Sequence, residues 1–571
     1  MEQAGGPSIP DSGARRFAHL RIAAAALSVI TVALVSAWLP GRADIPPLIE
    51  SDYCYLLTAA DRWYEGFGPT APYPVAPFQP WEWKTDWAFL TQWPVGYPAL
   101  ICTVRWLLDA DTLSAIRWIN VFASALALVG WFRFVRRAMP PGIVGNLAAC
   151  VAATSALTVN QLINPSTDLL MVAAIPWIML LAWPSRSAYS DCEIVLATVT
   201  PTKAGAGRSW IRLGIAGFLA GLLFWIRYAS VFVPAGMGLY LTIRAAGRRR
   251  RREIGEACVF FAGALVPMTA MLAVNHSHGL GESTQSQLNL GHQIHPNWSP
   301  HLIWTVWSRF TDLGYYDHHA WVRWMLLLIP GAMATACFWS RKLRERVRSM
   351  VSEPPVAAGV CLLVSFFVMI VTATAVFAGK FNFAALDRYY LPVRPLYFVL
   401  FIAPIAHLSR GRGRAVIGAA LILAAGWIVQ VEWVRDYQRA TRAGSEATPY
   451  GARAEAFSPN ATALYEWLSM RRANELILVS NFHEYIALET SIPALPIPPD
   501  RATLERWIAR IRGARKIDNV NVLFVLDPDN RWRNYWLPPM NEVIERFGLT
   551  QRESTARPET TVYVYEPDAG S

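Results

Sequence analysis

The chain has 571 residues, of which 54% are hydrophobic and only 16% are charged, whereas about a quarter of the residues in soluble domains are charged. Its net charge is +11, but the basic residues cluster beside apolar runs, where they set the orientation of a membrane protein. The composition therefore excludes an ordinary soluble protein, and the charge does not point to nucleic-acid binding. We predict a polytopic α-helical membrane protein.

Apolar runs of about twenty residues, the length that crosses a bilayer, occupy most of residues 1–435. The first run follows a basic start, as in a cleavable signal peptide. We interpret it as a retained first helix, because it is long enough to span and no small-residue cleavage site stands out. In all we predict about eleven spans, near residues 20–39, 113–135, 142–163, 167–183, 210–227, 228–245, 254–274, 321–339, 355–377, 389–408 and 414–434.

Clusters of arginine and lysine alternate along these spans. All of them fall on one face if the N-terminus is cytoplasmic, as the positive-inside rule expects. The predicted transmembrane region, 1–435, then exposes three loops on the outer face, 40–112, 275–320 and 378–388. Pro94 to Leu108 is apolar too, but counting it as a span would break the alternation. We expect it to lie at the outer surface or to re-enter from it.

The tail, residues 436–571, reads as a small soluble α/β domain that lies outside the cell membrane, because the span count is odd. Helical spacing occurs near 462–473, 502–513 and 539–547, and β-like runs occur at 476–480, 520–526 and 560–565. Strands that alternate with helices predict a short, mostly parallel sheet. Support, acceptor recognition and partner docking are all compatible with this domain.

Two carboxylates, Glu50 and Asp52, open the first outer loop directly after the first predicted span. Apolar residues then recur at helical spacing from Tyr53 to Phe67, which predicts an amphipathic helix on the membrane surface. Ser51 or Asp52 would serve simply as an N-cap. The functional alternative is that the carboxylates stand at the height of a membrane-held substrate headgroup.

Two further motifs belong to the same face. Thr91 to Leu100 contains Pro-Val-Gly-Tyr-Pro, which predicts a turn before an apolar helix. Asn164-Pro165-Ser166-Thr167-Asp168 forms a hinge between two spans. Asp168 would either cap the following helix or act as a functional ionisable group at a span end.

Cations also gather on the outer face, at Arg227, Lys380, Arg388 and Arg394. Each would snorkel to lipid headgroups, or together they would hold a phosphate, which arginine binds by bidentate contacts. Seven histidines lie in loop 275–320, without the helical spacing of a zinc protease. We read that loop as flexible and solvated and predict no cofactor or metal; a divalent metal stays open but has no support in the sequence.

The order of these motifs resembles a known family. A carboxylate opens the outer loop, and Pro-Val-Gly-Tyr-Pro, Ser-Thr-Asp-Leu-Leu and Arg-Tyr-Tyr-Leu-Pro follow in turn. Over residues 15 to 435 the chain resembles the GT-C membrane glycosyltransferases, especially the bacterial relatives of protein O-mannosyltransferases and aminoarabinose transferases. The resemblance implies transfer of a sugar from a polyprenyl-phosphate donor to an acceptor hydroxyl on the outer face.

The resemblance also implies roles for individual residues. Asp52 matches the acidic first-loop residue that is proposed as general base, although this chain has Glu50 and Asp52 separated by Ser51 instead of an adjacent acidic pair. Asp168 is similar to the second family carboxylate, near the acceptor or base. The residues that face the donor phosphate would be Arg388 and Tyr389, with Lys84 as a first-loop cation.

We therefore predict a hexosyl- or pentosyltransferase of the cell envelope. Its partners would be a polyprenyl-phosphate-linked sugar, a glycolipid, glycan or protein acceptor and membrane lipids, with no nucleic acid. For the departing phosphate we expect a positive environment from Lys84, Arg227, Lys380 or Arg388. The alternatives are a lipid or saccharide transporter or flippase, which would show internal repeats or broken midplane helices, and a non-catalytic scaffold that displays the C-terminal domain.

Overall fold

The structure is a computed structural model of the whole chain. It describes residues 47–72, 82–139, 142–183, 204–248, 251–278, 306, 340–341, 344–345, 353–377, 387–409, 412–442, 453–454, 462–471, 473–517, 520–526, 539–554 and 561–566.

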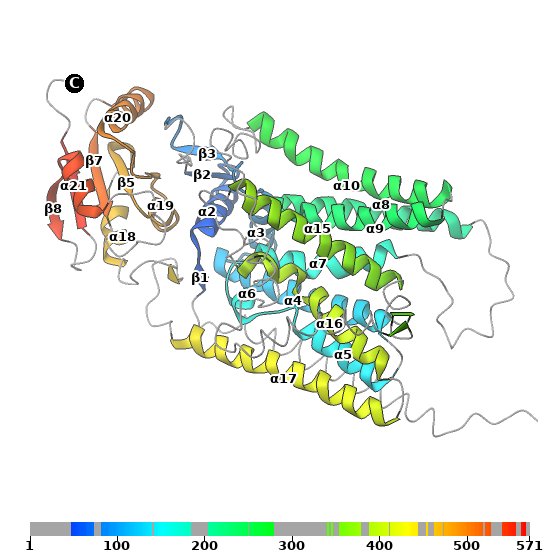
Figure 1. Cartoon of the computed structure of the whole chain (residues 1–571). Helices are drawn as coiled ribbons and strands as arrows, with labels where there is room; N and C mark the ends of the chain where they lie inside the picture. Colours follow the sequence, from blue (N-terminus) through cyan, green and yellow to red (C-terminus); the bar gives the residue numbers. More distant parts are fainter. Residues whose placement is uncertain are drawn as a thin grey trace, which may run out of the picture.

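A bundle of apolar helices makes up the larger part (Figure 1). Among the described residues, six helices are long and apolar enough to cross a membrane, and three shorter apolar helices accompany them. The bundle elements are α4 (Thr112–Ala138), α5 (Ile143–Thr154), α6 (Val159–Ile163), α7 (Thr167–Ala182), α8 (Ala204–Leu222), η2 (Leu223–Trp225), η3 (Tyr228–Val231), α9 (Phe232–Arg248), α10 (Arg251–His278), α15 (Pro354–Phe377), η5 (Asp387–Val393), α16 (Arg394–Leu408) and α17 (Arg412–Arg442).

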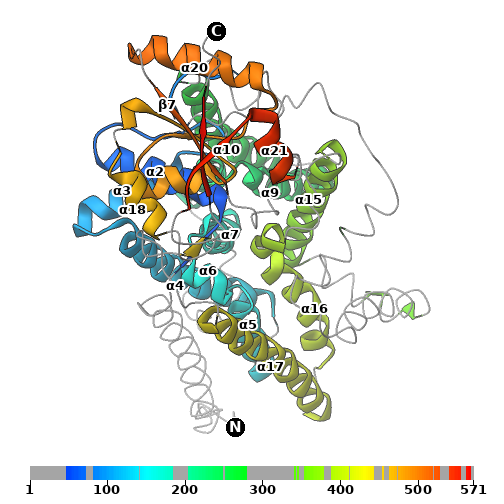
Figure 2. The same cartoon turned by 90° about the vertical axis from the view of Figure 1, so that its left-hand side faces the viewer.

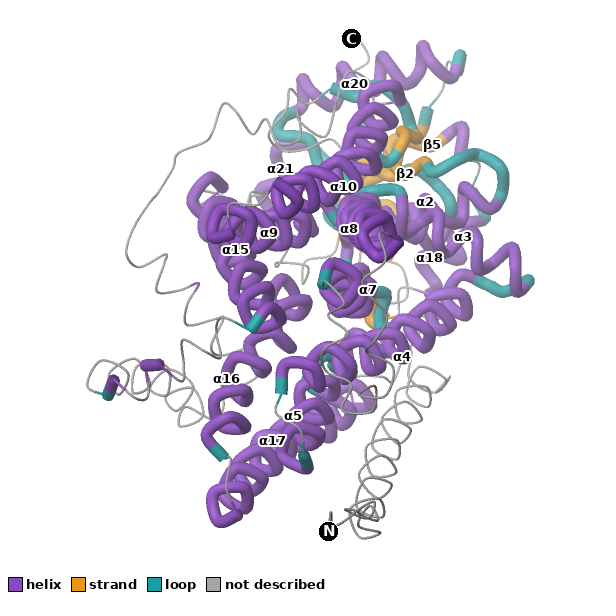
Figure 3. The backbone as a smooth tube through the Cα atoms, turned by 90° about the vertical axis from the view of Figure 1, so that its right-hand side faces the viewer, coloured by secondary structure: helices purple, strands orange, loops and turns teal. Residues whose placement is uncertain are grey.

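Helix α7 lies between α4 and α8 and contacts both (Figure 3). Its partner α8 packs closely against α10 because small residues line the contact. A Cβ atom on Gly217 would come 2.0 Å from the carbonyl oxygen of Phe260, and one on Gly221 would come 2.1 Å from that of Ala264. Such close approach is typical of helix packing in membranes, where van der Waals contact replaces the hydrophobic effect between helices.

The predicted span 142–163 is wrong as a single helix. Helix α5 ends at Thr154, and α6 begins at Val159, after Thr158, whose hydroxyl accepts a hydrogen bond from the Gln161 N–H. A polar capping residue offers the backbone an alternative to continuing the helix, and the apolar residues around it hide this break in the sequence. The predicted spans 20–39 and 321–339 lie outside the described residues.

A small outer segment follows the first predicted span. It consists of β1 (Leu48–Ile49), α2 (Ser51–Tyr64), the antiparallel pair β2 (Thr70–Pro72) and β3 (Trp87–Phe89), and α3 (Gly96–Leu108). At about 1.5 Å per residue, the 13 residues of α3 are too short for a hydrocarbon core of about 30 Å. The last turn of α3 exposes Trp106, Leu107 and Leu108, which suits the predicted position at the membrane surface.

The C-terminal residues form a five-stranded sheet in the order β6-β5-β7-β9-β8. The pairs β6–β5 and β5–β7 are parallel, but β7–β9 and β9–β8 are antiparallel. The sheet is therefore mixed, where the sequence predicted a mostly parallel one. Its elements are α18 (Thr462–Ser469), η7 (Ala473–Glu475), β5 (Leu476–Ser480), α19 (His483–Thr490), β6 (Ala494–Leu495), α20 (Arg501–Arg515), β7 (Asn521–Leu526), α21 (Met540–Phe547), β8 (Thr550–Ser554) and β9 (Thr561–Tyr565).

This sheet unit sits on the outer segment, at one end of the bundle (Figures 1 and 2). Buried side chains of α2, including Tyr55 and Leu56, share one hydrophobic core with Ile486 and Leu488 of α19. The short strand β1 pairs in parallel with β4 (Arg453–Ala454), which follows α17. Sheet unit, outer segment and bundle are thus joined by a continuous packed core.

Candidate functional site

Among the predicted site residues whose side chains the structure describes, the most deeply buried lies in the hinge before α7. The Ser166 hydroxyl caps the helix by accepting a hydrogen bond from the Leu169 N–H at 3.1 Å. Asp168 is 2% exposed and is not the cap, so the capping alternative for this residue is wrong. Because Ser166 satisfies the helix end, the Asp168 carboxylate is directed elsewhere.

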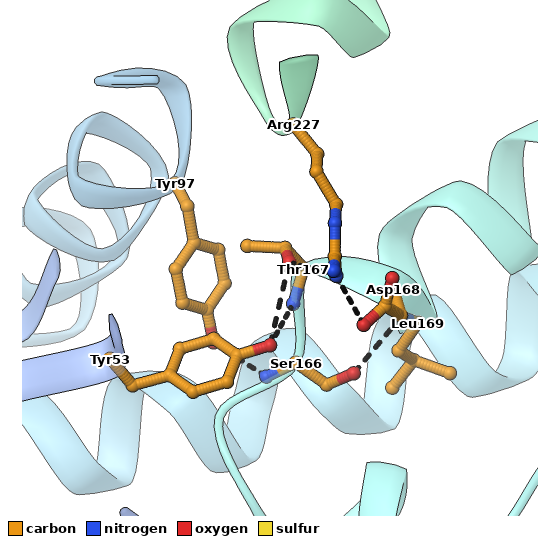
Figure 4. A network of polar contacts seen from close by, with 7 residues as sticks. All are labelled: Tyr53, Tyr97, Ser166, Thr167, Asp168, Leu169 and Arg227. Atoms are coloured by element: carbon orange, nitrogen blue, oxygen red, sulfur yellow. Dashed lines mark hydrogen bonds and ion pairs between the residues drawn. The ribbon is translucent and has the colours of Figure 1, made fainter. Parts of the chain in front are cut away.

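That carboxylate forms an ion pair with Arg227, which lies between η2 and η3 (Figure 4). The same guanidinium nitrogen, Nη1, donates to the Thr167 hydroxyl at 3.3 Å. The Arg227 guanidinium also stacks over the Tyr389 ring, 4.6 Å from its centroid. The side chains of Asp168 and Arg227 are only 4% and 14% exposed, so the pair is shielded from bulk water and couples strongly.

Two tyrosines bind the backbone of the hinge. Tyr53 of α2 accepts a hydrogen bond from the Thr167 N–H at 3.1 Å, and Tyr97 of α3 accepts one from the Ser166 N–H at 3.2 Å. Both rings lie on one side of Thr167, and the Arg227 guanidinium lies on the other (Figure 4). Burial raises the pKa of the Tyr97 phenol, and neighbouring Tyr53 adds to that rise. The two tyrosines therefore fix the first outer loop against the start of α7.

The first-loop carboxylates lie at the start of α2. Glu50 is the N-cap residue, Ser51 is the first helical residue, and Asp52 lies in the first turn. The predicted N-cap at Ser51 or Asp52 is therefore wrong. Both carboxylates are half-buried, and Tyr53, which binds the hinge, directly follows Asp52. The N-terminal end of α2 thus meets the N-terminal end of α7.

Helix α3 fixes the turn that carries Arg227. A Cβ atom on Gly96 would lie 2.4 Å from the carbonyl oxygen of Trp225, so only glycine lets α3 approach this closely. The Trp225 indole N–H donates to the carbonyl oxygen of Pro267 in α10 at 2.7 Å. The glycine of Pro-Val-Gly-Tyr-Pro therefore packs the outer segment against the turn two residues before Arg227.

The other predicted cations stand on other elements or outside the described residues. Lys84 is exposed, next to Trp83, which packs into the core of the C-terminal sheet. Arg394, the first residue of α16, is 3% exposed, and its guanidinium lies 6.0 Å from the Phe398 ring centroid. Lys380 and the side chain of Arg388 lie outside the part of the chain that the structure describes, although Arg388 directly precedes Tyr389 in η5.

Sequence reasoning did not assign roles to Tyr53, Tyr97, Asn120 or Asn164. Asn120 is fully buried in α4 and donates to the carbonyl oxygens of Leu162 and Asn164, both at 3.0 Å. A tyrosine or asparagine inside an apolar helix signals such a role, because a buried polar group needs a partner. The residue type therefore predicts that a hydrogen-bond partner exists, but it does not predict which residue the partner is.

No group of three or more potential metal ligands occurs among the described residues. Most of the histidine-rich loop 275–320 lies outside them, and His276 and His278 fall in the last turn of α10. His278 stacks on Phe89 of β3, with 4.7 Å between ring centroids. In the described part of the loop, histidine therefore contributes to packing.

No family model matches the chain, and no curated protein matches it in sequence. Solved structures do match in fold. ArnT from Cupriavidus metallidurans bound to undecaprenyl phosphate is 11% identical, with a TM-score of 0.55 over 95% of this chain and 98% of that one. The apo form of the same protein is 13% identical, with a TM-score of 0.50 over 97% and 99% of the two chains.

A third solved structure belongs to a different enzyme. The Archaeoglobus fulgidus oligosaccharyltransferase in complex with Zn and sulfate is 12% identical, with a TM-score of 0.51 over 94% of this chain and 73% of that one. At such low identity the match establishes the fold and not the chemistry. The chain therefore has the fold of the GT-C membrane glycosyltransferases, the family that its motifs resemble.

Proposed function

We propose that this protein is a membrane glycosyltransferase that moves a sugar from a polyprenyl-phosphate donor to an acceptor hydroxyl on the outer face of the membrane. One observation carries the proposal. The buried Asp168–Arg227 pair, stacked on Tyr389, stands where α2 delivers two carboxylates to the start of α7. The fold in which this arrangement occurs is that of ArnT, whose structure is bound to undecaprenyl phosphate.

The reaction needs a base at one side of the anomeric carbon and a cation at the other. In our scheme Asp52 or Glu50 accepts the proton of the acceptor hydroxyl, and the oxygen attacks the anomeric carbon. The bond to polyprenyl phosphate breaks, and the phosphate keeps the electron pair. This single displacement inverts the anomeric centre. A positioned base contributes about 10²–10⁴-fold in rate.

Arg227 is the cation that the described structure best equips to hold the leaving phosphate. A guanidinium has five N–H donors in a planar fork, so one arginine can hold a carboxylate and a phosphate oxygen together. We assign Asp168 to orient Arg227 through the ion pair, and not to act as the base. Charge stabilisation by preorganised donors supplies a share of the rate comparable to or larger than that of the base.

Other parts of the proposal come from the sequence. We place Arg388 and Tyr389 beside the donor phosphate, with Lys84 and Lys380 as further cations. The spans, about eleven in number, would surround the polyprenyl tail, with the N-terminus in the cytoplasm. The C-terminal α/β domain, from about residue 436, would lie outside. The transferred sugar would be a hexose or a pentose, and the acceptor a glycolipid, a glycan or a protein.

Sugar transfer from a radiolabelled polyprenyl-phosphate sugar in membranes tests the proposal. We expect Asp52→Asn, Glu50→Gln and Asp168→Asn to include at least one variant that loses transfer by about 10²-fold or more. Arg546→Gln, at an exposed ion pair on α21, is the matched control and should keep wild-type activity. Normal transfer in all three carboxylate variants would refute the catalytic assignment. It would favour a transporter or a scaffold instead.

A further inference from the structure

The two residues before the first-loop carboxylates form a strand with unusual anchoring. Leu48 and Ile49 make up β1, and Glu50 follows directly. On one side, the Leu48 N–H donates to Asn164 Oδ1 at 2.8 Å. Asn164 belongs to the hinge before α7, so this bond ties β1 to the membrane bundle.

On the other side, β1 is bound by the C-terminal sheet unit. The Tyr485 hydroxyl of α19 donates to the carbonyl oxygen of Ile49 at 2.9 Å, across 436 residues of sequence. Both residues are 2% exposed, so water does not compete for this bond. The strand also pairs with β4. The backbone just before Glu50 is therefore clamped between the bundle and the sheet unit.

A second contact from α19 reaches α2 one turn after Asp52. The Tyr55 hydroxyl lies 2.7 Å from His483 Nε2, and the Tyr55 ring stacks on Trp93 with 4.6 Å between centroids. Helix α19 thus contacts the chain on both sides of the carboxylates, at Ile49 and at Tyr55. Such bracketing fixes both position and rotation of the first turn of α2.

We propose that Tyr485 is a positioning residue for the first-loop carboxylates, and that Asn164 is its counterpart on the membrane side. The inference rests on the proposed glycosyltransferase function and assigns the C-terminal sheet unit a part in building the active site. The physical reason is the steep dependence of rate on geometry, since a misplacement of about 1 Å can cost about 10²-fold. Neither residue touches substrate in this scheme, so both act through Glu50 and Asp52.

Tyr485→Phe removes one hydroxyl and keeps the ring that packs in the core. We expect kcat for sugar transfer to fall about tenfold, with KM for the donor unchanged within about twofold. Binding of radiolabelled undecaprenyl phosphate should also be unchanged, because the donor-phosphate residues lie elsewhere. Tyr565→Phe is the matched control: its hydroxyl donates to Glu505 within the sheet unit at 3.0 Å, far in sequence from β1. Tyr565→Phe should lower the free energy of unfolding about as much as Tyr485→Phe does, and it should leave kcat unchanged.

Asn164 provides the second arm. Asn164→Ala should lower kcat as Tyr485→Phe does, whereas Asn164→Asp keeps an oxygen for the Leu48 N–H and should retain at least about half of wild-type kcat. Equal activity of the two Asn164 variants would overturn its role. Equal kcat in Tyr485→Phe and Tyr565→Phe would overturn the inference for Tyr485. Either result would leave the proposed function standing as long as the carboxylate variants are inactive; active carboxylate variants would refute the function itself.

Discussion

At the scale of single residues, Arg227 is the side chain that joins the elements of the candidate site. It pairs with Asp168, donates to Thr167 and stacks on Tyr389. These partners come from α7 and η5, which are distant in sequence. A buried cation that connects separate elements is costly to leave unpaired, because desolvation is repaid only while its partner is in place.

That cost gives a prediction for stability. Asp168→Asn leaves the Arg227 charge buried without its carboxylate. Arg227→Gln leaves the Asp168 carboxylate buried without its cation. Each should destabilise the protein by about 3 kcal/mol or more. The double variant, which carries neither charge, should recover most of the loss while transfer activity stays absent. Unfolding in detergent measures all three, with Arg546→Gln at an exposed pair as control, expected to change by less than about 1 kcal/mol. Strict additivity of the two single changes would contradict direct coupling.

At the scale of elements, the close contact between α3 and the turn of Trp225 is the most restrictive packing at the site. Gly96→Ala would place a methyl group 2.4 Å from a backbone oxygen, so α3 or the turn has to shift. We expect a fall in transfer activity of about tenfold or more, because the turn carries Arg227. Gly247→Ala in α9 is the matched control, since a Cβ atom there has no neighbour within 4 Å. Assay of both variants in membranes makes the comparison, and equal activity would contradict this role for Gly96.

Element boundaries were predictable where the sequence pattern is strong. The spacing at 502–513 predicts α20 (Arg501–Arg515), and the β-branched run at 520–526 predicts β7 (Asn521–Leu526). Helix α19 escaped prediction because five consecutive residues, from Glu484 to Leu488, are buried. A helix that is buried on all sides has no polar face and therefore no 3.6-residue period. Strand β8, Thr-Gln-Arg-Glu-Ser, lies at the sheet edge and lacks apolar alternation.

The candidate site was predictable to a different extent. Asp168 and Arg227 were both candidates, Asp168 as an ionisable group at a span end and Arg227 as one of the outer-face cations that could hold a phosphate. Their pairing with each other was not predictable, since it depends on how α7 meets the turn before α9. Likewise, Asn164 and Tyr485 hold β1 through backbone atoms of Leu48 and Ile49. Backbone atoms leave no side-chain signature in the sequence.

At the scale of the whole molecule, the contacts between the sheet unit and the outer segment include charged groups. Arg515 of α20 binds both oxygens of Asp86, at 2.8 and 3.0 Å. Two parallel bonds of this kind add geometric specificity to the attraction. Since Asp86 belongs to the predicted first outer loop, the sheet unit and that loop have to lie on the same side of the membrane.

This relation leads to a prediction of topology. In a background without the seven native cysteines, Met470→Cys should react with a membrane-impermeant maleimide in intact cells, because Met470 is 80% exposed on the sheet unit. Gly413→Cys lies at the N-terminal end of α17, the end away from the sheet unit. It should react only after the membrane is permeabilised. The positive-inside rule sets this expectation. If only Gly413→Cys were labelled in intact cells, the predicted orientation would be wrong and the opposite one correct.

The bond between Tyr485 and Ile49 also affects the order in which the newly synthesised chain folds. A ribosome that adds about 5–20 residues per second needs roughly 20–90 s to extend the chain over the 436 residues that separate these two partners. During that interval the backbone before Glu50 lacks its outer anchor. The outer segment around Ile49 therefore completes its contacts only after α19 has been made, and a chain that terminates before α19 would insert in the membrane without this anchor.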